Sequence, residues 1–131
     1  MNNISYSAVV LDDESRNKLI KIFKPMIPEK YEIIAHHMTI KLGALDENSQ
    51  AKRDMIEGKT IILKVIDYAI DDKVMAVGVI GYESMNAKPH ITLAVNKKEG
   101  GKPVMSNYLK DWKEVIVPLE LTGNVTEVEF R

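Results

Sequence analysis

The chain of 131 residues contains no cysteine, which excludes a disulfide framework, a cysteine zinc site and a thiol nucleophile. Its 18 Lys and Arg residues against 19 Asp and Glu residues give a net charge of −1, so we expect no duplex DNA partner. The sequence has neither a signal peptide pattern nor an apolar run long enough to span a bilayer, so we expect no membrane partner. We therefore expect one cytoplasmic domain over residues 1–131 that is a monomer.

Turn-forming residues divide the chain into strand and helix segments. β-branched and apolar runs predict strands over residues 5–11, 32–42, 60–70, 73–82, 90–96, 115–121 and 125–130, the last two being separate or one strand bulged at Gly123. A helix is predicted from Asp12 or Asp13 to near Pro25, with an apolar face made of Leu19, Ile22, Phe23 and Met26. Residues 46–57 form a short helix or a loop, and residues 105–112 a short helix. This order predicts an α+β fold in which helices flank a largely antiparallel sheet.

The chain has only three histidines, and two of them are followed by threonine two positions later. The pairs are His37 with Thr39 and His90 with Thr92, each inside a predicted strand. In a strand, residues two positions apart point to the same face, so each pair presents an imidazole beside a hydroxyl. If the two strands lie near one another, two imidazoles and two hydroxyls converge on one cleft.

The alternate residues of both strands are apolar and are expected to face the core: Met38, Ile40, Ile91 and Leu93. His36 directly precedes His37, so strand alternation predicts that its side chain points away from the cleft as a packing or surface residue. The same geometry argues against a metal site shared by these two histidines, and no carboxylates stand where they would complete one. We therefore expect no metal and no cofactor.

Two imidazoles and two hydroxyls suit the hydrolysis of a phosphodiester without a metal. A histidine near its ordinary pKa of about 6.5 can accept or donate a proton at physiological pH. One of His37 and His90 can accept a proton from the attacking water while the other donates to the leaving oxygen, and the sequence leaves open which does which. The hydroxyls of Thr39 and Thr92 can donate to the non-bridging phosphate oxygens.

The two motifs, His37-Met38-Thr39-Ile40 and His90-Ile91-Thr92-Leu93, resemble the paired His-x-Thr-x motifs of the two-histidine (2H) phosphoesterase superfamily. The chain most resembles the cyclic phosphodiesterase domain of fungal-type tRNA ligases, through His36 to Thr39, Pro89 to Thr92, residues 102–109 and the closing strand with Gly123. The resemblance implies a bilobal fold with pseudo-twofold antiparallel sheets and flanking helices. It also implies metal-independent opening of a 2′,3′-cyclic phosphate, or cleavage of a 2′–5′ or 3′–5′ linkage, in a nucleotide or RNA-end substrate.

The chain carries no ligase or kinase module beside this domain, so we expect a stand-alone enzyme. Compact stand-alone members of the superfamily occur in viruses, where some degrade 2′–5′ oligoadenylates or cyclic-nucleotide defence signals in the host cytoplasm. The first alternative is therefore a viral-type hydrolase of such signals. The second is a module that holds a nucleotide or an RNA end without cleaving it, and the third is a structural domain with no nucleotide site.

Positive charge gathers after the second motif, because residues 88–113 hold six lysines and two acidic residues. This segment is a candidate seat for an anionic ligand. Within it, Lys102 and Ser106 are predicted to bind substrate, since both lie in the part that resembles the family. Lys41 shares strand parity with His37 and Thr39 and is a further candidate.

Two tyrosines complete the predicted substrate-binding set. Tyr6 lies in the first predicted strand, and Tyr82 lies shortly before the second motif. Either ring could stack on a nucleobase, because every base offers a flat face to an aromatic side chain.

Overall fold

The structure is a computed structural model that describes residues 3–130. Its strands are β1 (Ile4–Leu11), β2 (Glu32–Ile33), β3 (His37–Leu42), β4 (Thr60–Ile70), β5 (Val74–Ile80), β6 (His90–Val95) and β7 (Lys113–Glu129). Its helices are α1 (Asp13–Phe23), α2 (Gln50–Glu57) and the short 3₁₀ helices η1 (Lys24–Met26), η2 (Lys97–Glu99) and η3 (Pro103–Tyr108). The predicted α+β class is confirmed. None of the described helices has the length and apolar character needed to cross a membrane.

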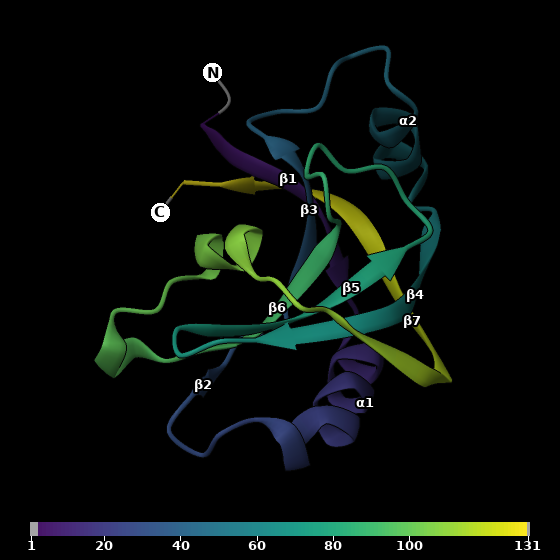
Figure 1. Ribbon diagram of the computed structural model, residues 1–131. Coiled ribbons are helices and arrows are strands. Elements are labelled where there is room, and N and C mark those ends of the chain that lie inside the picture. Colours follow the sequence, from purple (N-terminus) through teal and green to yellow (C-terminus); the bar gives the residue numbers. More distant parts are fainter. Residues whose placement is uncertain (1–2, 131) are drawn as a thin grey trace.

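The strands form one antiparallel sheet that closes on itself. Its order is β2-β6-β3-β1-β7-β4-β5, and a further pairing of β6 with β5 joins six of the strands into a closed cylinder. Helix α1 lies at one end of this cylinder and α2 at the other (Figure 1). The bilobal arrangement is not confirmed, because the strands belong to a single closed sheet rather than to two separate ones.

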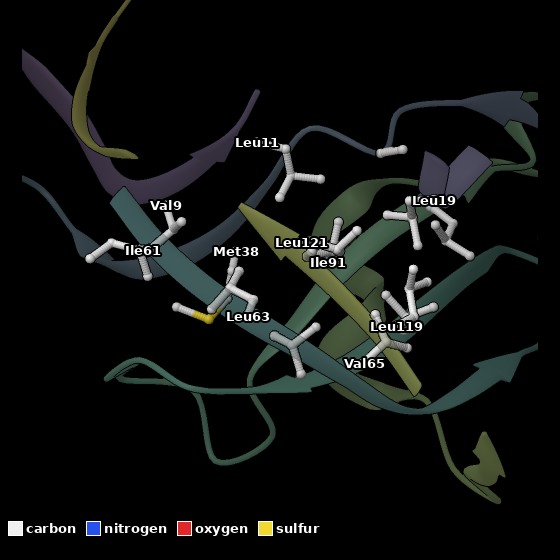
Figure 2. Close-up of a cluster of buried hydrophobic side chains, with 14 of the residues drawn as sticks. Val9, Leu11, Leu19, Met38, Ile61, Leu63, Val65, Ile91, Leu119 and Leu121 are labelled. Carbon is white, nitrogen blue, oxygen red and sulfur yellow. The ribbon is translucent and has the colours of Figure 1, made fainter. Parts of the chain in front are cut away.

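The main core lies inside the closed sheet, where alternate residues of every long strand meet (Figure 2). Met38 of β3, Leu63 of β4, Ile91 of β6 and Leu121 of β7 are completely buried there. Burying such side chains stabilises the fold by about 1.5–3 kcal/mol each. Since Met38 and Ile91 point inward, as predicted, the residues on either side of them point outward.

A second, smaller cluster covers the outer face of β5 and β6, which explains why β5 is almost uniformly apolar. Val74, Ala76 and Val95 pack there against Leu109, which follows η3. Helix η3 contacts both strands and lies over that outer face. The prediction of a short helix over 105–112 is therefore corrected to a 3₁₀ helix that begins earlier, at Pro103.

Helix α1 begins and ends where the sequence predicts. The Asp12 carboxylate accepts a hydrogen bond from the Ser15 backbone amide at 2.8 Å, and the helix ends before Pro25. The predicted apolar face is only half right. Leu19 and Phe23 are buried, but Ile22 and Met26 are 47% and 42% exposed because α1 rests on the sheet through the narrower stripe of Ser15, Leu19 and Phe23.

Two strand predictions need correction. The segment 32–42 is two strands rather than one, because Ala35 adopts the left-handed region at φ 43° and interrupts the alternation before His37. The single-strand alternative for residues 115–130 is confirmed as β7, but its bulge is wrong, because the pairings with β1 and β4 continue through Gly123 without a register shift. Gly123 serves a close approach instead of a bulge, since a Cβ there would lie 2.3 Å from the Val10 carbonyl oxygen.

Candidate active site

The predicted histidine–threonine quartet lines one cavity on the outer face of β3 and β6. The cavity has a volume of about 390 Å³. Its lining residues are Tyr6, Ile34, His37, Thr39, Leu42, Met85, Asn86, His90, Thr92, Pro103, Val104 and Asn107. The structure thus brings both imidazoles and both hydroxyls together, from two strands that lie far apart in the sequence.

The pairing of β3 with β6 explains this convergence. Met38 lies opposite Ile91 in the antiparallel ladder. These are equivalent positions of the two motifs, so a local twofold axis relates the motifs to one another. In this register His37 lies beside Thr92 and Thr39 lies beside His90, with all four side chains on the outer face.

Two segments wall the cavity. The loop between β5 and β6 folds back over β3, where the Ser84 hydroxyl donates to the Thr39 carbonyl at 2.7 Å and the Met85 amide donates to the Ile40 carbonyl at 2.7 Å. The other wall is η3, whose Ser106 hydroxyl lies 2.8 Å from the Thr92 hydroxyl. Ser106 is buried and is not among the lining residues, so it contacts Thr92 without itself lining the cavity.

His90 is held in one orientation by its own chain. Its Nδ1 lies 2.7 Å from the Lys88 carbonyl oxygen. Because a carbonyl oxygen can only accept a hydrogen bond, Nδ1 carries a proton, and Nε2 is the ring nitrogen that can exchange a proton with a ligand. Burial lowers the pKa of His90, the hydrogen bond to the Lys88 carbonyl opposes that change, and the Lys88 ammonium lowers the pKa further.

The residue that orients His90 is itself anchored. The Lys88 ammonium pairs with the Asp67 carboxylate and lies 4.7 Å from the centre of the Trp112 ring. Both contacts fix the chain directly before Pro89. Lys88 therefore helps to position His90 through its backbone carbonyl, while its side-chain ammonium is paired with Asp67.

His37 contacts two other rings. It stacks on Tyr6 with ring centroids 4.7 Å apart and an interplanar angle of 27°. The His36 Nδ1 lies 2.9 Å from the His37 Nδ1. Burial, followed by the nearby charges of His36 and His90, lowers the pKa of His37 to about 4. His37 is therefore neutral at physiological pH.

The contact between His36 and His37 corrects the prediction that His36 points to the opposite face. That prediction assumed a continuous strand, but β3 begins only at His37 and the left-handed Ala35 turns the preceding chain. The rest of the prediction agrees with the structure, because His36 is exposed and is not among the cavity-lining residues. Its ring meets that of His37 edge to face, with centroids 5.1 Å apart.

Of the five predicted substrate-binding residues, Tyr6 lines the cavity and Ser106 supports it, whereas the structure does not bring the other three into the lining. Lys41 forms an ion pair with Asp46 at 3.2 Å. The Tyr82 hydroxyl donates to the Asp54 carboxylate, and burial of the ring, followed by this hydrogen bond, raises the pKa of Tyr82. Lys102 is exposed at the start of η3. Strand alternation and proximity in the sequence do not determine that Asp46 and Asp54 are the partners of Lys41 and Tyr82.

Sequence reasoning missed the residues that the two walls contribute. Met85 and Val104 bring apolar surface to the rim and are each 59% exposed. Asn86 and Asn107 bring side-chain amides that can donate to or accept from a ligand. The position of these residues in the sequence was the available indication. Asn86 and Met85 lie in the loop just before the second motif, and Val104 and Asn107 lie after it, within residues 102–109, which carry part of the family resemblance.

The cavity carries little positive charge. No lysine or arginine is among its lining residues in the described part of the chain. Within residues 3–130, no three or more His, Asp and Glu side chains form a group that could hold a metal ion.

Comparisons with protein-family models and with curated proteins found no match to this chain.

Proposed function

We propose that this chain is a metal-independent phosphodiesterase of the 2H superfamily that opens a nucleotide 2′,3′-cyclic phosphate. The observation that carries the proposal is the convergence of His37, Thr39, His90 and Thr92 on one cavity. Under this proposal the pairing of Met38 with Ile91 between β3 and β6 marks the pseudo-twofold axis that relates the two motifs.

The reaction is the hydrolysis of one P–O bond. Water attacks phosphorus, one histidine accepts its proton at Nε2, the bond to a ribose oxygen breaks, and the other histidine donates a proton to that oxygen. The product is a phosphate monoester with one free ribose hydroxyl. Thr39 and Thr92 donate to the non-bridging oxygens. The Thr92 hydroxyl donates to the Pro103 carbonyl at 3.3 Å, and we expect it to exchange this long bond for one to the phosphate while Ser106 keeps its oxygen in place.

The size and charge of the cavity favour a small substrate over the defence-signal alternative. Its volume of about 390 Å³ lies at the lower end of the range of roughly 300–1,000 Å³ for ligand pockets, which suits about one nucleotide. A 2′–5′ oligoadenylate or a cyclic oligonucleotide carries several phosphates, whereas the described lining offers no lysine or arginine to pair with them. A cyclic mononucleotide carries a single negative charge, which fits two imidazoles and two hydroxyls.

The proposal is tested by product analysis in the presence of EDTA. Wild-type protein is incubated separately with 2′,3′-cyclic AMP, a 2′–5′ adenylate trimer and a cyclic dinucleotide, and ³¹P NMR follows each phosphate. We expect EDTA-resistant conversion of the cyclic mononucleotide to a monoester, with kcat/KM at least about tenfold above that for the larger substrates, a difference of about 1.4 kcal/mol.

The other outcomes decide between the alternatives. Faster turnover of the trimer or the cyclic dinucleotide would favour the viral-type hydrolase. Tight binding of intact ligand without any product would favour the non-catalytic module. If the protein neither bound nor turned over any of the three compounds, a nucleotide site would be rejected.

A further inference from the structure

The third histidine of the chain makes a hydrogen bond that decides what His37 can do. The two Nδ1 atoms of His36 and His37 lie 2.9 Å apart, a distance that requires one proton between them. If that proton is on His36, a neutral His37 carries its own proton on Nε2 and cannot act as a base there. If it is on His37, the Nε2 of His37 is unprotonated and can accept a proton.

The position of the proton on a neutral His90 is fixed. Its Nδ1 donates to the Lys88 carbonyl in every protonation state, so its Nε2 carries a proton only when the ring is an imidazolium. A general acid needs a pKa near the operating pH, and an imidazolium has one, whereas the N–H of a neutral imidazole is far too weak an acid. A working pair therefore has one neutral ring with an unprotonated Nε2 and one imidazolium.

We propose that His36 is a positioning residue that accepts the Nδ1–H of His37, which makes His37 the general base and His90 the general acid. This rests on the proposed function as far as catalysis is concerned, while the hydrogen bond itself does not. Each catalytic ring then donates its Nδ1–H to a fixed acceptor: the Lys88 carbonyl for His90, and the Nδ1 of His36 for His37.

The surroundings of the two rings agree with this division. His37 is stacked on Tyr6, and burial is the main reason that its ring stays neutral. The pKa of His90 is lowered as well, by burial and by the Lys88 ammonium, but the hydrogen bond to the Lys88 carbonyl favours the charged form of that ring and opposes the change. In the reaction His37 Nε2 takes the water proton and His90 Nε2–H gives its proton to the ribose oxygen, so protons balance.

The tautomer of His37 can be measured without substrate and without activity. In ¹⁵N-labelled wild-type protein at neutral pH, long-range ¹H–¹⁵N correlation spectra distinguish a protonated ring nitrogen from an unprotonated one. We expect His37 to have a protonated Nδ1 and an unprotonated Nε2, and His36 to have the reverse. A protonated Nε2 on His37 would overturn the proposal.

Two variants of His36 separate positioning from a merely structural role. In His36→Asn the side-chain oxygen can still accept from His37 Nδ1–H, whereas His36→Leu offers no acceptor. We expect His36→Leu to lower kcat about tenfold with little change in KM, a part of the ~10²–10⁴-fold that general base catalysis supplies, and His36→Asn to stay within about twofold of wild type.

Each result has a definite reading, because His36 is exposed and its replacement leaves the core intact. A His36→Leu enzyme with the wild-type rate, or equal losses in both variants, would overturn the positioning role. Wild-type protein that shows the expected His37 tautomer but no turnover of any nucleotide would support the hydrogen-bond assignment and reject the phosphodiesterase.

Discussion

Replacing His90 by asparagine is expected to lower kcat for 2′,3′-cyclic AMP at least about 10²-fold, the low end of what general acid–base catalysis contributes. The asparagine amide can replace the Nδ1–H that His90 donates to the Lys88 carbonyl at 2.7 Å, but it has no counterpart of Nε2. The loss therefore reflects the missing proton donor and not a collapsed site. Steady-state kinetics in EDTA measure the rate, and the thermal unfolding midpoint shows whether the fold survives.

Two lysines that lie outside the cavity lining provide matched controls for His90→Asn. Lys41 is paired with Asp46, and Lys102 is exposed at the start of η3. We expect Lys41→Ala and Lys102→Ala to keep kcat/KM within about threefold of wild type, since neither side chain is among the residues that line the cavity. A His90→Asn enzyme that kept its full rate, or lysine variants that lost as much as it did, would refute the assignment of the site.

Gly123→Ala is expected to lower the free energy of unfolding by about 3 kcal/mol, because a methyl group would be forced into a packed site. The added Cβ would lie 2.3 Å from the Val10 carbonyl oxygen and 2.9 Å from the Val10 carbonyl carbon. Both atoms belong to the backbone of β1, so relief requires β1 and β7 to separate where Gly123 also pairs with Ile61 of β4. Denaturant unfolding at constant pH measures the change.

Gly58 provides the comparison for Gly123. It ends α2 in the left-handed region at φ 66°, and nothing lies within 4 Å of an added Cβ. Asparagine tolerates this region, so Gly58→Asn is expected to cost less than about 1 kcal/mol. If Gly123→Ala unfolded at the wild-type denaturant concentration, the close approach of β1 and β7 would be wrong.

The alternation of the two motifs could be predicted from the sequence because it depends only on local geometry. A strand has a period of two, so the side of His37 and Thr39 follows from the apolar character of Met38 and Ile40. His36 shows where such reasoning ends. Its placement depends on Ala35, which adopts the left-handed region at φ 43°. A glycine or asparagine at this position would have indicated that conformation in the sequence, whereas an alanine does not.

The remainder of the site depends on contacts between distant parts of the chain. Strand parity put Lys41 on the face of His37, but the position of its ammonium is set by Asp46 across a turn. Asn86 and Asn107 enter the cavity from segments that have no periodic pattern. The closure of the sheet through the pairing of β5 with β6 is likewise a long-range event that no local pattern encodes.

The most direct test of the account is a titration of the three histidine rings by NMR, with and without 2′-AMP, one of the two monoesters that opening of 2′,3′-cyclic AMP can give. In the free protein we expect His37 to titrate with a pKa of about 4. A phosphate bound between the rings stabilises their protonated forms, so 2′-AMP should raise the pKa of both His37 and His90 with one saturable affinity that strengthens as the pH falls. A ligand that left both rings unchanged, or moved only one of them, would contradict a shared phosphate site.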